Sequence, residues 1–148
     1  MAIIQSATTS FKVELLQGIH NFGPTSPDTF KIALYTGTAN INQTTTAYTA
    51  TGEVVGTGYT AGGQTLTIST SPTSGTNSQS VPTAYISFAN STWPNATFTA
   101  RGALIYNVTE GNKSVAVLDF GSDKTVNNDT FQIIFPTPDA NSAIVRIS

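Results

Sequence analysis

The sequence has 148 residues, of which 39% are hydrophobic and only 9% are charged, and its formal net charge at pH 7 is −2. A chain of this length can bury roughly 70% of the surface that its unfolded form exposes. We therefore expect a single domain over residues 1–148, with residues 1–10 as a possible N-terminal arm. The small negative charge leaves no large basic surface, which argues against nucleic acid and against membranes as partners.

Polarity in this sequence comes mainly from uncharged side chains. An average globular domain has about 25% charged residues, so the surface here must be built largely from Thr, Ser, Asn and Gln. Long charged side chains lose much conformational entropy when they are ordered, and they are depleted at the centres of interfaces. The composition is therefore compatible with a large contact surface, although Thr is also simply common in strands.

The sequence contains no cysteine, so disulfides and thiolate metal sites contribute nothing to it. Its first ten residues lack a cationic start followed by a long apolar run, and no stretch approaches the 18 or so apolar residues of a membrane span. We therefore expect the protein to be made and folded in a cytoplasm.

The first predicted element is a short helix. Thr9 or Ser10 can cap it, apolar residues recur at helical spacing from Phe11 onwards, and Gly18 limits its length. After an interruption rich in Pro and Gly, residues 28–36 alternate apolar and other side chains, which predicts a strand with one buried face.

The middle of the chain has weaker periodicity. Residues 37–52 are predicted to be a long loop or an edge strand, and the glycines between 56 and 63 to form tight turns. Residues 64–69 alternate as a strand does. The Pro-, Gly-, Ser- and Thr-rich residues 71–81 are predicted to be a surface loop, residues 84–88 a strand and residues 90–95 a turn.

The clearest two-strand signal lies in residues 97–120, which predict a central β-hairpin that turns at residues 110–113. Residues 121–129 are predicted to be a polar turn, followed by strands at 130–135 and 143–147. Seven or eight short strands with turn signals about every dozen residues predict an all-β fold, namely an antiparallel β-sandwich or jelly roll with one short N-terminal helix.

Candidate catalytic residues are few. His20 is the only histidine, and its place just after the predicted helix favours a packing role over that of a catalytic base. Asp119, Asp123 and Asp129 could form a carboxylate pair or bind calcium, but they lie in or beside a predicted turn, where aspartate is common. We therefore expect no catalytic residue, no cofactor, no metal and no enzymatic activity.

Four residues are candidates for contact with a partner. Ile3 and Ile4 lie in the possible arm. Trp93, the only tryptophan, would either cover the core or anchor an interface. Arg101 lies among apolar strand residues, where it would either pair with Asp119 or Asp123 across the sheet or point outward to a partner.

Five strings between residues 11 and 147 are distinctive: FKVELLQGIHNF, DTFKIALYT, GTGYTAGGQTLT, ATFTARGALIYN and VAVLDFGSDKT. Through them, most of the chain resembles a family of small virion structural proteins of tailed bacteriophages, which are similar to head decoration or cement proteins. The resemblance implies a protein on the outer surface of the capsid, where it bridges subunits of the major capsid protein and stabilises the shell. It also implies a homo-dimer or homo-trimer, because repeated shell sites present symmetric surfaces.

An alternative is a tail, fibre or head–tail component that binds glycans on the host surface. In that case exposed aromatic side chains, namely Trp93, Tyr48 and Tyr59, would stack on sugar rings.

Overall fold

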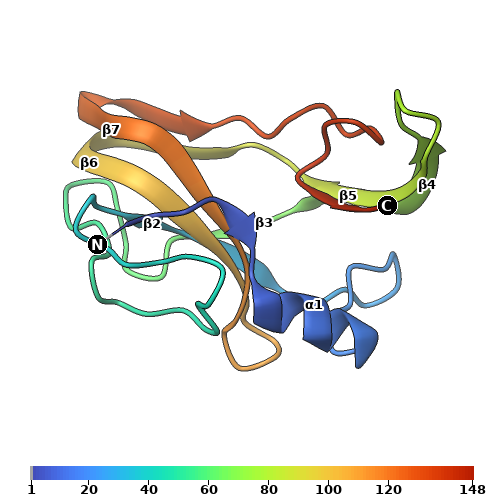
Figure 1. Ribbon diagram of the computed structural model, residues 1–148. Helices are drawn as coiled ribbons and strands as arrows, with labels where there is room; N and C mark the ends of the chain where they lie inside the picture. The colour runs from blue at the N-terminus through green and yellow to red at the C-terminus, as the bar shows by residue number, and fades with distance from the viewer. Residues whose placement is uncertain (1) are drawn as a thin grey trace.

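The computed structural model describes residues 2–148 and shows an all-β protein, with 50% of residues in strands and 5% in a helix (Figure 1). The prediction of an all-β fold with antiparallel sheets and one short N-terminal helix is confirmed. One sheet has the strand order β1-β7-β6-β2-β3 and the other the order β4-β5-β8. The elements are β1 (Ser6–Ala7), α1 (Thr9–Leu16), β2 (Phe30–Tyr35), β3 (Gln64–Leu66), β4 (Ile68–Thr76), β5 (Pro82–Phe88), β6 (Ser91–Asn107), β7 (Lys113–Ile133) and β8 (Val145–Ile147).

The long β6–β7 hairpin dominates the larger sheet. It turns between Asn107 and Lys113, where Gly111 and Asn112 adopt φ values of 72° and 64°. The predicted hairpin at residues 97–120 is therefore confirmed, but both strands continue beyond it. The 17 residues of β6 pair with the 21 residues of β7 as far as Ser91 and Ile133.

The turns predicted at residues 90–95 and 121–129 are wrong, because turn-forming residues there make irregularities within the strands. Asn95 has a φ of 51° and lies where the pairing shifts between Trp93 and Ala96. Gly121 has a φ of 77° and lies opposite the shift between Ala100 and Gly102. A β-bulge bends a strand without reversing it, so the hairpin curves around the core.

The prediction of a surface loop at residues 71–81 is also wrong for its first half. β4 extends to Thr76 and pairs with β5, with irregular pairing on both sides of Thr70. β4 is an edge strand, and an edge strand tolerates a proline such as Pro72 together with exposed Ser and Thr. Because most side chains of β4 are polar, the spacing of apolar residues did not predict this strand.

Both faces of the five-stranded sheet are buried around β2 and the adjoining parts of β6 and β7. On one face Phe30, Ile32 and Leu34 of β2 belong to the main core, which also contains Phe88 of β5 and Phe11 of α1. The other face carries a second core, which the N-terminal arm and the loop after β2 complete. The buried members of this second core are Ile3, Ala33, Tyr35, Ala39, Ile41, Leu104, Tyr106 and Val117.

The strand predicted at residues 28–36 to have one buried face is thus buried on both, because the loop between β2 and β3 folds back against the sheet (Figure 1). The helix also differs in detail. Thr8, not Thr9 or Ser10, is its N-cap and accepts from the Phe11 amide at 3.4 Å. Phe11 is buried, whereas Leu16 is 92% exposed.

Candidate functional site

The four predicted interface residues lie in different environments. Ile3 is 9% exposed and bridges to Ile41 in the second core, so it packs inside this fold, whereas its neighbour Ile4 is 48% exposed. The Nε of Arg101 lies 3.4 Å from Oδ1 of Asp119, which confirms the predicted pairing across the sheet. Of these residues, Ile4 and the partly exposed Arg101 side chain remain at the surface.

Trp93 belongs to the main core. It is 1% exposed, and its ring lies 6.4 Å from that of Tyr59 and 5.9 Å from that of Phe131. The interpretation of Trp93 as an interface anchor is therefore wrong for this fold, because β6 directs its side chain inward opposite Phe131. The same burial removes Trp93 from the aromatic set expected to stack on glycans.

The other two aromatic residues of that set, Tyr48 and Tyr59, donate their hydroxyl protons to a buried carboxylate. The Tyr48 hydroxyl lies 2.7 Å from Oε2 of Glu53, and the Tyr59 hydroxyl lies 2.6 Å from Oε1. The amide of Gly62 donates to the same Oε1 at 2.7 Å. Glu53 is 9% exposed, so its side-chain oxygens are satisfied mainly by these donors rather than by water.

This Glu53 cluster completes the edge of β2 where β3 ends. β3 pairs with residues 30–32 only. At Leu34, the backbone amide donates to the Tyr59 hydroxyl at 2.9 Å, and the backbone carbonyl accepts from the Val54 amide at 2.9 Å. Both backbone groups of Leu34 are therefore satisfied by the loop. No sequence pattern indicated this cluster, apart from an isolated acidic residue between two tyrosines.

Tyrosines around Glu53 have raised pKa values. Burial, followed by the nearby Glu53 charge, raises the pKa of Tyr106 to about 12. Burial is also the main cause that raises the pKa of Tyr35, Tyr48 and Tyr59, with Glu53 contributing in each. All four hydroxyl groups therefore keep their protons well above neutral pH.

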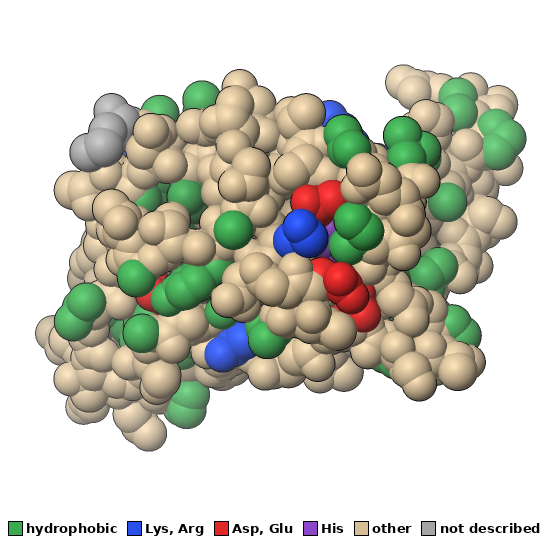
Figure 2. Space-filling view, turned by 90° about the horizontal axis from the view of Figure 1, so that it is seen from below, with side chains coloured by type: hydrophobic (Ala, Val, Ile, Leu, Met, Phe, Trp, Pro, Cys, Tyr) green, Lys and Arg blue, Asp and Glu red, His purple; other side chains and the backbone are tan. Residues whose placement is uncertain are grey.

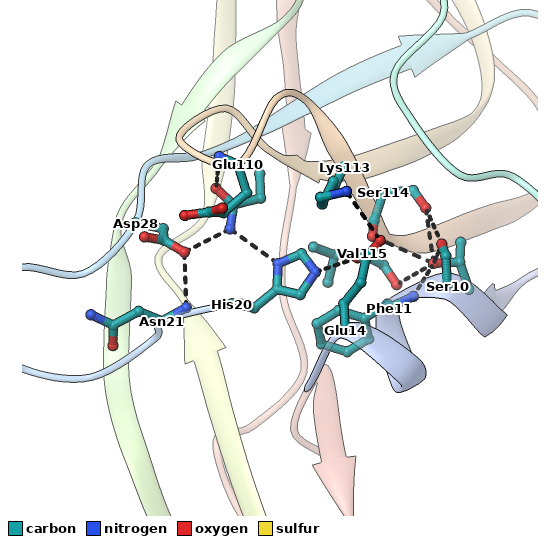
Figure 3. A network of polar contacts seen from close by, with 12 residues as sticks. Ser10, Phe11, Glu14, His20, Asn21, Asp28, Glu110, Lys113, Ser114 and Val115 are labelled. Carbon is teal, nitrogen blue, oxygen red and sulfur yellow. Dashed lines mark hydrogen bonds and ion pairs between the residues drawn. The ribbon is translucent and has the colours of Figure 1, made fainter. Parts of the chain in front are cut away.

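A second buried polar network surrounds His20 (Figure 3). Its Nε2 lies 2.7 Å from Oε2 of Glu14, and its Nδ1 lies 3.0 Å from Nδ2 of Asn107. Because an amide nitrogen can only donate, Nδ1 accepts and Nε2 carries the proton that is donated to Glu14. Asn107 Nδ2 also donates to Asp28 at 2.8 Å, and Lys113 Nζ lies 3.6 Å from Glu14 Oε1.

The His20 network joins three separate parts of the chain: α1, the segment before β2 and the β6–β7 turn (Figure 3). Both ring nitrogens of His20 are occupied by Glu14 and Asn107, so neither reaches a hydroxyl or an open surface. The arrangement positions the helix against the hairpin, in agreement with the predicted packing role.

The aspartates considered as metal ligands do not converge. Asp119 pairs with Arg101 and also accepts from the Gly121 amide at 2.8 Å. Within residues 2–148, no group of three or more His, Asp or Glu side chains is arranged to hold a metal ion. Nor does the described chain contain a helix that is long and apolar enough to cross a membrane.

Two neighbouring hollows lie along one side of the molecule, and we call them together the β8 groove. One, of about 510 Å³, lies between the curved β7 strand and the segment that follows it; the other, of about 530 Å³, lies between α1, β7 and β8. They share Gln5, Leu118 and Ile144. This groove could not be predicted from the sequence, because alternation predicts which strand face is apolar but not whether a second sheet covers it.

The surface seen from below carries few charged side chains, and uncharged polar groups and backbone cover most of it (Figure 2). This agrees with a sequence that holds only 8 acidic and 6 basic residues in 148.

Comparison with known proteins adds no assignment: no protein-family profile, no curated protein and no solved structure matches this chain.

Proposed function

We propose that the protein is a structural protein of a bacteriophage virion that binds the outer surface of the head and bridges neighbouring subunits of the major capsid protein. The observation that carries the proposal is the surface, which is built from short uncharged polar side chains with only 9% charged residues in the sequence. Such side chains lose little entropy when a partner orders them. The sequence resemblance to small phage virion proteins supports the same proposal.

The proposed mechanism is stabilisation by linkage. A protein that binds only to the assembled and expanded shell favours that state over any other. The fold suits this role, because the part of the sheet around β2 that is buried on both faces provides a stiff body between two contacts. A homo-dimer or homo-trimer would match the symmetry of repeated shell sites.

Glycan binding by a tail or fibre component is the less favoured function. The aromatic set that it requires is not free, since Trp93 lies in the core and the hydroxyl groups of Tyr48 and Tyr59 bind Glu53. We also propose that the protein has no enzymatic activity.

The proposal is tested on phage particles that lack this protein. They should release their genome at a lower temperature than complete particles, and addition of the purified protein should restore the difference. Equal release temperatures with and without the protein would contradict a cement function.

A further inference from the structure

The two sheets of the protein differ in width, and the smaller one leaves part of the core uncovered. β8 ends the three-stranded sheet and pairs with β5 alone among the described strands. Eight apolar residues pack on the main core while remaining partly exposed. Six of these eight line the β8 groove, namely Leu15, Leu118, Phe120, Phe131, Ile144 and Val145.

We propose that the β8 groove accepts an extended segment of a partner protein, which adds to the outer edge of β8 as a further strand. Backbone hydrogen bonds to the open edge would hold the segment, and every second side chain would enter the groove over Leu118, Phe131 and Ile144. An added strand would cover the part of the core that the three-stranded sheet leaves open. The partner segment is therefore apolar at alternate positions.

The chain itself shows how an extended segment lies beside this groove. The N-terminal arm forms β1, in which Ser6 and Ala7 pair with Val117 and Ala116 of β7. The pairing ends at Gln5, whose side-chain Oε1 accepts from the Asp119 amide at 3.2 Å. Gln5 also lines both hollows of the groove. The arm thus covers the neighbouring edge of β7 and forms part of the groove wall.

Charge defines the ends of the partner segment. The rim of the groove carries three exposed cations, Lys12, Lys124 and Arg146, and none of them forms an ion pair within residues 2–148. The carboxylate on the rim, Asp119, is already paired with Arg101. A segment with acidic residues on both sides of its apolar centre is therefore the complementary partner.

A second copy of this chain is a poorer occupant. Antiparallel pairing of two β8 strands about a twofold axis at Arg146, the middle residue of β8, would place Arg146 directly opposite its symmetry mate. Like charges that face each other across strands are destabilising. The inference goes beyond the proposed function and does not rest on it, since a strand-accepting groove would serve in any assembly.

The test begins with short random peptides displayed on phage and selected on the immobilised full-length protein. We expect enrichment of peptides with apolar residues at alternate positions and acidic flanks. Arg146→Glu should weaken binding of the resynthesised peptide by about tenfold or more, because it reverses a rim charge. The control Thr51→Glu, which adds an acid to the exposed loop between β2 and β3, should leave binding unchanged.

Hydrogen exchange then separates strand addition from simple filling of the groove. The bound peptide should slow amide exchange in residues 144–148, which contain β8. Three results would overturn the inference: no enrichment of the expected pattern, peptide binding that Arg146→Glu leaves unchanged, or binding without added protection at β8. Self-association of the unliganded protein that Arg146→Glu abolishes would also overturn it, because the occupant would then be a second copy.

Discussion

The Tyr59 hydroxyl accepts a hydrogen bond from the backbone amide of Leu34 at 2.9 Å, although the two residues are 25 positions apart. The same hydroxyl donates to Glu53 at 2.6 Å. One side chain therefore closes the edge of β2 and holds the long loop that follows it. The stability of the five-stranded sheet depends on this loop, because the loop supplies part of the second core.

Removal of the Tyr59 hydroxyl should destabilise the protein. Tyr59→Phe leaves the Leu34 amide without its partner and removes one of the two donors to Oε1 of Glu53. An unsatisfied buried group costs about 1–3 kcal/mol. Urea denaturation followed by circular dichroism measures the change. The matched control is Tyr85→Phe, because the Tyr85 hydroxyl makes no hydrogen bond within the described residues. Equal effects of the two substitutions would contradict the role of Tyr59.

Stability should fall in alkaline solution. Tyrosine has an ordinary pKa near 10, whereas the pKa of Tyr106 in the folded protein is about 12 and those of Tyr35, Tyr48 and Tyr59 are also raised. Between these values the unfolded chain loses protons that the folded chain keeps, so rising pH favours unfolding.

Each such tyrosine should lower the free energy of unfolding by up to about 1.4 kcal/mol per pH unit above about pH 10. Denaturation curves recorded from about pH 9 to about pH 12 test this. Tyr59→Phe, which removes one of the four groups, should show a shallower decline. A stability that stays constant over this range would contradict the burial of the tyrosine cluster.

Replacement of Asn107 by a charged residue should destabilise the protein. Its Nδ2 donates to His20 Nδ1 at 3.0 Å and to Asp28 Oδ2 at 2.8 Å, and the residue is fully buried. Asn107→Asp replaces a donor by an acceptor beside the Asp28 carboxylate, and we expect a loss of about 3 kcal/mol or more at neutral pH. Part of this loss should be recovered in acid, when a carboxyl group becomes protonated.

The control for this substitution is Asn127→Asp on the exposed side of β7, which should change stability by no more than about 0.5 kcal/mol. A tolerated Asn107→Asp would show that the hydrogen bonds around His20 are assigned incorrectly.

Trp93 should behave as a core residue. Its intrinsic fluorescence should have the emission maximum of a buried indole, resist quenching by iodide and shift to longer wavelength on unfolding. Trp93→Ala should cost about 3–5 kcal/mol, whereas Ile4→Ala on the exposed arm should cost little. Ready quenching of Trp93 in the native protein would restore the possibility that it contacts a partner.

Local pattern was sufficient to predict the class of fold and the central hairpin, because residues 97–102 alternate clearly and Gly111 and Asn112 permit a tight turn. It failed where turn residues form bulges inside long strands, as at Asn95 and Gly121. A bulge and a turn use the same residue types, and only pairing with a distant strand distinguishes them.

Long-range contacts also explain what was missed at the candidate sites. The Glu53 cluster depends on a loop that folds back over the sheet, and the His20 network depends on Asn107, which lies 87 positions away in the chain. The pairing of Arg101 with Asp119 was predictable because both residues lie on neighbouring strands of one hairpin. The β8 groove follows from the unequal widths of the sheets, which periodicity does not encode.

The most direct test of the proposed virion function is the copy number of this protein in purified phage particles, measured by quantitative mass spectrometry against the major capsid protein. The proposal predicts a fixed ratio and a copy number on the order of hundreds, as expected for a component that repeats over a symmetric shell. A copy number of about a dozen or fewer would place the protein at the portal or tail and contradict the cement function; absence from the particle would contradict the virion function altogether.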